Sequence, residues 1–365
     1  MRIKLRQAFD LQMGKTPARN RPDYWNGDHK WISIADIGNA GKFLTKTKES
    51  ITKAGIDGSG IKVVPQGTVI MSFKLSIGKT AITSEDMYTN EAIMAFIDNG
   101  KFAVDTDYLY HLCCGTNWTA GTNKAVMGLT LNKATLLEKE IPLPDINEQH
   151  EIATKLDKID AIIAERQQQL ELIDQAVKSR FIELFGDPQR NPHGYKHTKL
   201  SDIATYYNGL TYKPENVAAE GTIVLRSSNI QNSQLDFADT IRVDCAIKER
   251  LMVQKNDILM CSRNGSAKLV GKVALIKDIQ EPMSFGAFMM IIRSHYFGYL
   301  MTYFQMDAFR QQIKTGATTT INQITGRMLD DVTIPLPPMA LVDQFAAFVE
   351  QTDKSKLCGR MEVAA

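Results

Sequence analysis

Two short runs contain the residue types that bind phosphate groups. Gly14-Lys15-Thr16 and Gly78-Lys79-Thr80 each match the last three positions of a phosphate-binding loop. Such a loop needs another glycine five residues earlier, and this chain has Phe9 and Phe73 at those positions. We therefore exclude a nucleotide-binding loop at either run.

Catalytic motifs of other enzyme classes are also incomplete or missing. The run 191–195, Asn-Pro-His-Gly-Tyr, partly matches the motif with which adenine methyltransferases hold a flipped base, but one proline is replaced, the tyrosine is displaced, and no glycine-rich cofactor loop accompanies it. No Gly-x-Ser-x-Gly or His-Glu-x-x-His occurs, and the histidines are scattered. The cysteines form no Cys-x-x-Cys pair. We predict a chain that is not itself an enzyme and holds no metal or cofactor.

Composition indicates an ordinary folded protein of two domains that would position any binding residues. The chain has 365 residues, and domains hold roughly 150 residues each. A hydrophobic content of 44% with 23% charged residues excludes disordered and collagen-like classes. We expect a cytoplasmic protein, because no run of about 18 apolar residues occurs and the first residues lack the apolar core of a secretory signal.

Charge is separated along the chain although the net charge is only +2. Residues 1–82 hold 14 basic and 6 acidic side chains, whereas residues 141–186 hold 5 basic and 9 acidic ones. The pattern indicates either a basic binding surface kept apart from an acidic one, or solvated faces that happen to cluster.

An internal repeat is the strongest signal in the sequence. Ile141-Pro142-Leu143-Pro144 returns 193 residues later as Ile334-Pro335-Leu336-Pro337. Further matches in the same order pair residues 31–37 with 223–230 and residues 67–72 with 256–262. Short β-rich runs bounded by Gly, Asn and Ser predict that each copy is a mixed, mainly β domain.

A long helix is predicted from Asn147 to Phe185, where neither glycine nor proline occurs. Its apolar residues recur at alternating steps of four and three, which is typical of a coiled-coil seam. Asp145 or Asn147 is the candidate cap, and Gly186 followed by Pro188 ends the helix. Such a helix is about 58 Å long at 1.5 Å per residue, which favours a spacer or assembly surface over a core helix between domains.

A second, shorter helix is predicted over residues 339–356, after the second Ile-Pro-Leu-Pro. Antiparallel packing of the two helices would relate the two domains by an approximate two-fold axis. The predicted seam contains apolar residues of both helices: Ile152, Leu156, Ile159, Ile163, Leu170, Ile173, Val177, Leu184, Leu341, Phe345 and Phe348.

These residues resemble the specificity subunits of type I restriction-modification systems. Residues 140–157 with the heptad run look like the central conserved region of that family, and residues 184–200 are similar to the start of its second target-recognition domain. The run 316–322, Gly-Ala-Thr-Thr-Thr-Ile-Asn, also resembles a family segment. The resemblance covers nearly the whole chain.

The resemblance implies an α+β fold with two target-recognition domains in tandem, separated by long helices that pack as an antiparallel coiled coil with pseudo-two-fold symmetry. Its expected segments are domain 1 at 1–140, a central region at 141–186, domain 2 at 187–333 and a helical region at 334–365. Each domain would recognise one half of an interrupted double-stranded DNA target. The helices would fix the gap and dock two methyltransferase (modification) subunits that use S-adenosylmethionine. Restriction subunits that use ATP and Mg²⁺ would join them.

Candidate DNA contacts are polar side chains on loops beside strands. In the first copy they are Lys15, Thr16, Arg19, Lys30, Lys74, Ser76, Lys79, Asn117, Trp118, Thr119 and Lys124. In the second copy they are Tyr212, Lys213, Arg226, Ser228, Asn229, Ser262, Arg263, Asn264, Lys268, Thr319 and Asn322. Arg263 and Asn264 are favoured most, because Arg can bind guanine and Asn adenine through two hydrogen bonds.

The acidic face of the long helix is expected to contact partner proteins, since DNA repels it. Its residues are Glu148, Glu151, Asp157, Asp160 and Glu165.

One departure from the family leaves other functions open. The second helix is shorter than usual for the family, so Leu170, Ile173 and Val177 would be exposed unless another chain covers them. A truncated or regulatory protein that dimerises through the seam is one alternative. The specificity subunit of a type IIB-like enzyme, whose partner both methylates and cuts, is another.

Overall fold

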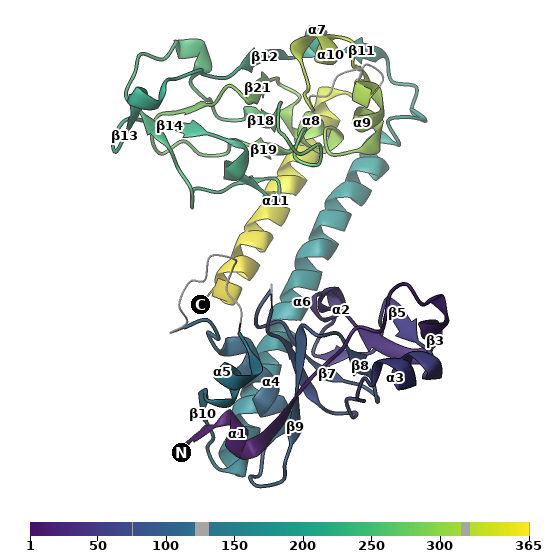
Figure 1. Ribbon diagram of the computed structural model, residues 1–365. Coiled ribbons are helices and arrows are strands. Elements are labelled where there is room, and N and C mark those ends of the chain that lie inside the picture. The colour runs from purple at the N-terminus through teal and green to yellow at the C-terminus, as the bar shows by residue number, and fades with distance from the viewer. Residues whose placement is uncertain (75, 121–130, 315–321, 365) are drawn as a thin grey trace. The chain divides into compact units, whose positions relative to one another are not determined.

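The computed structural model describes residues 1–74, 76–120, 131–314 and 322–364, with the backbone alone for residue 314 and residues 357–364 (Figure 1). The chain divides into two compact units, Met1–Ala164 and Glu165–Ala365, and the long helix α6 (Ile146–Phe185) spans the boundary. The four-segment division expected from the sequence stays a prediction. Each unit is described by itself.

Unit 1 is built on two main sheets. The five-stranded sheet has the order β2 (Phe9–Met13), β9 (Ile93–Asp98), β6 (Val69–Ser72), β7 (Thr80–Thr83), β4 (Phe43–Leu44). The three-stranded sheet has the order β5 (Glu49–Ile51), β3 (Trp25–Ile32), β8 (Tyr88–Thr89). A further pair joins β1 (Arg2–Lys4) to β10 (Glu140–Pro142). The helices are α1 (Leu5–Ala8), η1 (Pro22–Tyr24), α2 (Ile34–Asn39), α3 (Lys53–Ser59), α4 (Thr106–Gly115) and α5 (Lys133–Leu137).

Unit 2 repeats this plan with two four-stranded sheets. The first has the order β12 (Thr205–Asn208), β21 (Met289–Arg293), β18 (Ile258–Cys261), β19 (Val273–Leu275). The second has the order β13 (Val217–Ala218), β17 (Arg242–Val243), β14 (Thr222–Leu225), β20 (Met283–Phe285). Two pairs join β11 (His197–Lys199) to β22 (Thr333–Pro335) and β15 (Ile230–Gln231) to β16 (Gln234–Leu235). The helices are α7 (Leu200–Ile203), η2 (Pro214–Asn216), η3 (Ser227–Asn229), η4 (Glu249–Leu251), α8 (Phe297–Tyr303), α9 (Asp307–Lys314), α10 (Gly326–Asp330) and α11 (Met339–Ala364).

Strand register confirms the internal repeat. Every residue of β6 and of β18 is buried, which agrees with their mainly apolar sequences; Ser72 is the polar exception in β6. β6 pairs antiparallel with β9 from Val69↔Phe96 to Ser72↔Ile93, and β18 pairs with β21 in the same way, from Ile258↔Ile292 to Cys261↔Met289. β3 pairs parallel with β8, as β14 does with β20. Each unit is therefore a mixed domain of helices and strands with a shared set of strand pairs, and the units differ in that β4 belongs to unit 1 alone and β13 to unit 2 alone.

Helix α6 begins one residue before the predicted start and ends at the predicted residue. Asp145 is its cap, because its Oδ1 accepts a hydrogen bond from the Glu148 N–H at 3.0 Å. The helix ends where Gly186 adopts a φ of 74°, a conformation that glycine adopts without strain. Fewer of its apolar residues are covered than predicted: Leu156 is 36% exposed and Ile159 is 51% exposed.

Helix α11 corrects the expectation of a short second helix. It begins at Met339 as predicted but continues to Ala364, so it has 26 residues. Within unit 2, α11 and the last turns of α6 run antiparallel side by side (Figure 1), since Phe345 contacts Phe181 near one end of the pair and Lys356 pairs with Asp174 further along. Leu170, Ile173 and Val177 are half-buried, which corrects the expectation that they would be exposed.

The two units have separate cores. In unit 1, Phe9, Met71 and Phe96 pack with residues of α4 and of α6. In unit 2, the core includes Phe181 and Phe185 of α6 together with Tyr299 and Phe345. Among the other predicted seam residues, Val177, Leu184 and Leu341 pack against this core, Ile152 packs against the unit 1 core, and Ile163 and Phe348 are half-buried.

Candidate nucleic-acid interface

Loops that follow several strands meet at one edge of unit 2. The N–H of Leu210, after β12, donates to the Phe285 carbonyl of β20 at 2.7 Å, and the N–H of Gly286 donates to Leu225 of β14 at 2.9 Å. After β18, the N–H groups of Ser262 and Arg263 both donate to the Phe288 carbonyl, at 3.0 and 3.1 Å. We call residues 209–213, 226–228, 262–272, 286–288 and 322–323 the unit 2 loop edge.

The same arrangement forms an edge of unit 1. The Lys15 N–H donates to the Thr89 carbonyl at 2.9 Å, the Asn90 N–H donates to Ile32 at 3.0 Å, and the Phe73 N–H donates to Ala92 at 3.0 Å. We call residues 14–16, 33, 73–74, 76–79 and 90–92 the unit 1 loop edge.

Arg263 and Asn264 lie together on the unit 2 loop edge, as their adjacency in the sequence suggests. Arg263 is exposed, and its guanidinium lies 5.5 Å from the ring centroid of Phe288. The Asn264 side chain donates to the Ser227 hydroxyl at 3.3 Å and accepts from the Ser266 N–H at 3.0 Å. The Asn322 side chain donates to the Gly265 carbonyl at 3.3 Å, which brings it to the same loop. A cation, amides and an exposed aromatic ring thus share one surface.

Phe288 was missed by sequence reasoning. It is 59% exposed although its neighbours Met289 and Met290 are buried. In the sequence it belongs to an apolar run that looks like core, so only the observed burial pattern identifies it as a surface residue.

Two candidates of unit 2 turn inward, which corrects their assignment as DNA contacts. Asn229 is fully buried: its side chain accepts from the Arg226 N–H at 2.8 Å and donates to the carbonyls of Asp236 and Asp239. Ser262 is 5% exposed. Asn229 therefore holds the loop together and has no donor left for a base.

The remaining candidates of unit 2 lie on its loop edge. Arg226 pairs with Asp239 at 2.7 Å, and its buried Nε has no hydrogen-bond partner among the described residues. Lys213 pairs with Glu215 at 3.3 Å, Tyr212 is half-buried, and Ser228 and Lys268 are exposed. Thr319 lies outside the described residues.

In unit 1 the loop edge brings five of the predicted residues together. They are Lys15, Thr16, Lys74, Ser76 and Lys79. The Lys15 ammonium donates to the Ser59 carbonyl at 3.3 Å, while the Thr16 hydroxyl donates to Glu91. That hydrogen bond holds the pKa of the Glu91 carboxyl below its usual value. Lys79 is exposed and Lys74 is half-buried.

Arg19 and Lys30 are not among the residues of the unit 1 loop edge, and both form ion pairs. Arg19 pairs with Glu49, and its guanidinium lies 3.9 Å from the ring centroid of Trp25. The hydrogen bond to Glu49 raises the pKa of Arg19. Lys30 donates to the Thr45 carbonyl at 2.7 Å and pairs with Glu85. Both cations thus form ion pairs with acidic residues of unit 1.

Trp118, at the centre of the predicted cluster, does not lie on the surface. Trp118 is 2% exposed in the unit 1 core, and its indole N–H donates to the Cys113 carbonyl at 2.8 Å, which corrects its assignment as a DNA contact. The Asn117 side chain accepts from the Thr119 N–H and hydroxyl, so it stabilises a local turn. Lys124 lies outside the described residues.

One acidic residue of the predicted partner-binding face, Asp157, contacts other side chains of unit 1. Asp157 accepts from Lys42 at 2.6 Å and lies 2.7 Å from the His111 Nε2, so it is paired within unit 1, and its contact with a partner protein stays a prediction. Partial burial opposes the charged form of Asp157, but the hydrogen bonds from Lys42 and His111 outweigh it, so the pKa of the carboxyl is lowered. The acids that stay exposed are Glu148, Glu151, Asp160 and Glu165.

Gln149 anchors α6 to unit 1 and was also missed. Its side chain is 1% exposed, accepts from the Asp105 N–H at 2.9 Å, and donates to the carbonyls of Ala103 and Pro144 at 3.1 and 2.9 Å. A Gln in a run of polar helix residues carries no sequence signal for burial.

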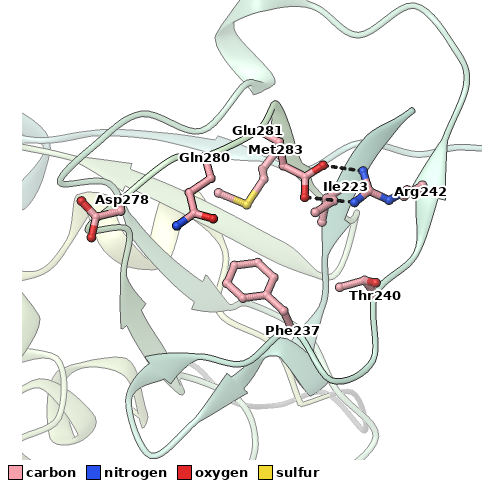
Figure 2. A pocket seen from close by; sticks show the side chains of 8 residues that line it. All are labelled: Ile223, Phe237, Thr240, Arg242, Asp278, Gln280, Glu281 and Met283. Carbon is pink, nitrogen blue, oxygen red and sulfur yellow. Dashed lines mark hydrogen bonds and ion pairs between the residues drawn. The ribbon is translucent and has the colours of Figure 1, made fainter. Parts of the chain in front are cut away.

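A cavity of about 460 Å³ lies at the other end of the second sheet of unit 2 (Figure 2). Ile223 and Met283, near the amino ends of β14 and β20, line it, and Figure 2 shows the double contact of Arg242 with Glu281 at its side. The cavity is therefore remote from the loop edge, which follows the carboxyl ends of the same strands.

Among the described residues, no group of three or more His, Cys, Asp or Glu side chains is arranged to hold a metal ion. No helix in the described part of the chain is long and apolar enough to span a membrane.

Comparison with known proteins gives one consistent result. A family model described as type I restriction modification DNA specificity domain matches residues 1–173 and 192–357. The type I restriction enzyme MjaIX specificity subunit of Methanocaldococcus jannaschii is 23% identical over 95% of this chain and 85% of its own length. The EcoKI specificity subunit of Escherichia coli is 28% identical over 45% of this chain and 38% of its own length.

Solved structures share the fold. The type I restriction-modification S subunit from M. genitalium aligns over 100% of this chain and 92% of its own length, with a TM-score of 0.53 at 15% identity. A structure described in terms of complex assembly and conformational transition of the type I restriction-modification system aligns over the same shares, with a TM-score of 0.55 at 17% identity.

Proposed function

The chain belongs to the family of type I restriction modification DNA specificity domains, and on that premise we propose that each of its two units recognises one half of a two-part DNA target. The proposal rests mainly on the repeated topology: four strands of the first sheet follow the same order in both units, the central pairs have matching register, and each unit has its own core and its own loop edge. Two separate recognition surfaces on one chain suit an interrupted target.

The chemistry of the unit 2 loop edge supports direct reading of bases. Arginine can bind guanine through two hydrogen bonds in the major groove, and asparagine can bind adenine in the same way. Arg263 is exposed beside Asn264 and Asn322. The backbone hydrogen bonds from residues 262 and 263 to Phe288 fix where this loop leaves the sheet, so the side chains are presented on a supported turn.

Partner proteins supply the reaction in this proposal. Methyltransferase subunits dock on the exposed acids of α6, together with the exposed apolar residues Ile159 and Ile162 on the same helix. Two such subunits and the restriction subunits complete the assembly. S-adenosylmethionine, ATP and Mg²⁺ act in those partners.

The experiment that tests the function is methylome sequencing of the host with and without this gene. Loss of adenine methylation at one interrupted motif on deletion, restored by the gene in trans, is the expected result. A methylome without any changed motif contradicts the proposal.

A single substitution then tests whether each unit recognises its own half-site. Arg263→Ala should weaken and relax recognition of one half-site only, because unit 1 keeps its own loop edge. Lys255→Ala is the matched control, since Lys255 is exposed just before β18, at the opposite end of the sheet from the loop edge. Equal loss at both halves with Arg263→Ala rejects the assignment.

The docking surface is tested by charge reversal. Replacing Glu148, Glu151, Asp160 and Glu165 by lysine should abolish co-purification with the methyltransferase subunit, while circular dichroism of the chain stays unchanged. Unchanged complex formation rejects the acidic face as the docking surface.

A further inference from the structure

The two loop edges can be compared residue by residue, because the same backbone hydrogen bonds occur in both. The Ser72 N–H donates to the Lys79 carbonyl at 2.9 Å, and the Cys261 N–H donates to the Lys272 carbonyl at 2.9 Å. The Gly78 N–H donates to Ser72 at 2.9 Å, and the Gly271 N–H donates to Cys261 at 2.8 Å. Lys79 and Lys272 therefore occupy equivalent positions.

The glycines before these lysines are equivalent as well. Gly78 has a φ of 92° and Gly271 a φ of 80°, values that other residues adopt only with strain. Each glycine turns the chain back into the next strand, β7 or β19, so the lysine enters that strand at the loop edge in both units. A Gly-Lys pair is thus kept at one structural position although the loop before it is four residues longer in unit 2, from 262 to 271 against 73 to 78.

Other equivalent positions differ in chemistry. Ala92 and Phe288 accept the matching hydrogen bonds from Phe73 and Ser262, both at 3.0 Å, so they are equivalent. Ser33 and Arg226 are equivalent because the N–H of each donates at 2.8 Å to a side chain three residues ahead, Asp36 or Asn229. Unit 1 has a buried methyl group and a half-buried hydroxyl at these positions, where unit 2 has an exposed aromatic ring and a half-buried guanidinium.

The contrast between the shared lysines and the differing side chains corresponds to the contrast between the phosphate backbone and the base edges of a DNA duplex. The phosphate backbone is the same at every sequence, whereas the base edges differ. Two domains that read different half-sites need the same charge where they contact phosphate and different side chains where they contact bases.

We propose that Lys79 and Lys272 are equivalent phosphate contacts, one in each unit, and that the positions Ser33/Arg226 and Ala92/Phe288 determine the different half-site preferences of the two units. The inference rests on the proposed function and assigns roles within its binding surface. Lys74 and Arg263 directly follow the equivalent residues Phe73 and Ser262, so they are also equivalent positions. We do not assign them as a second phosphate pair, because lysine and arginine have the same charge but different donor geometry.

The phosphate pair is tested by the salt dependence of binding. Full-length chain and its Lys79→Ala and Lys272→Ala variants are titrated with a fluorescent duplex of random sequence between about 50 and 300 mM salt. Each substitution should reduce the slope of log affinity against log salt concentration by about 0.9, the value for one phosphate contact. Lys101→Ala and Lys255→Ala are the matched controls, because both lysines are exposed at the opposite end of the sheets, after β9 and before β18.

The specificity positions are tested with Phe288→Ala, read out in the host methylome and by the same titration. The modified motif should change in one half only, while the salt slope stays at the wild-type value. Thermal unfolding of each variant, followed by circular dichroism, confirms that the variants fold.

Each outcome separates this inference from the proposed function. Wild-type slopes for both lysine variants overturn the phosphate pair, as does a changed motif in Lys272→Ala. An unchanged motif in Phe288→Ala overturns the specificity positions. If the wild-type chain shows no interrupted motif, the proposed function fails and takes the specificity positions with it, but the salt slopes still decide the phosphate pair.

Discussion

The ring of Phe181 stacks on that of Tyr299, with centroids 5.0 Å apart and planes inclined by 28°. Phe181 belongs to α6 and Tyr299 to α8, so this contact fixes the long helix to the core of the second recognition unit. Phe345 of α11 completes the cluster, with its ring centroid 5.6 Å from that of Phe181. The hydroxyl of Tyr299 also donates to the Pro335 carbonyl at 3.1 Å, and Tyr108 makes the equivalent bond to Pro142 in unit 1 at 2.9 Å.

Phe181→Ala should therefore destabilise unit 2 by about 3–5 kcal/mol, because it leaves a cavity where three elements meet. All 3 tryptophans lie in unit 1, so denaturant unfolding followed by circular dichroism should shift while the tryptophan-fluorescence transition stays in place. Ile182→Ala is the matched control, since Ile182 is 40% exposed on the same helix. A wild-type transition for Phe181→Ala contradicts this packing.

Asn229→Ala should lower stability rather than alter base preference. The substitution leaves the Arg226 N–H and two carbonyls without their partner, which costs about 1–3 kcal/mol. The neighbouring exposed residue gives the control, Ser228→Ala, which we expect to be neutral. Denaturant unfolding measures both, and a changed motif in Asn229→Ala at wild-type stability would restore Asn229 as a base contact.

Acid should loosen the attachment of α6 to unit 1. The pKa of Asp157 is lowered in the folded state, so its contribution is present above the ordinary carboxylate pKa of about 4 and is lost as pH falls below that value. As pH is lowered, the free energy of unfolding of unit 1 should thus fall less in Asp157→Asn than in wild type. Denaturant unfolding followed by tryptophan fluorescence measures it. Asp160→Asn, a more exposed position, should keep the wild-type pH profile. Identical profiles for wild type and Asp157→Asn disprove the role of the ion pair.

Gly209→Ala should disrupt the unit 2 loop edge. A Cβ at Gly209 would lie 2.1 Å from the Gly286 carbonyl oxygen, so the segments that follow β12 and β20 must move apart. We expect a loss of about 1–3 kcal/mol from overpacking, with weaker DNA binding. Gly265→Ala is the control in the same unit, because nothing lies within 4 Å of its Cβ. Full stability of Gly209→Ala would show that this close approach is dispensable.

Local sequence patterns were sufficient for the long helix and the repeat. From Asn147 to Phe185 the absence of glycine and proline, with apolar residues at helical spacing, is enough to predict a helix. The buried strands β6 and β18 are also predicted by their sequences, because each is a short, mainly apolar run. The end of α11 was harder to predict, since Gly359 weakens a helical pattern without ending it.

The sequence alone determined the long helix, the start of the second helix and the repeat of mainly β copies, because helix and strand periodicity depend on residues close together in the chain. Only the tertiary structure decided which polar residues face outward. Asn229 and Ser228 are adjacent and similarly polar, yet one is buried and the other exposed, and Trp118 lies in the core beside the exposed Asn117. The equivalence of Lys79 with Lys272 also depended on backbone hydrogen bonds between distant strands, whose register is set by how the sheets pack.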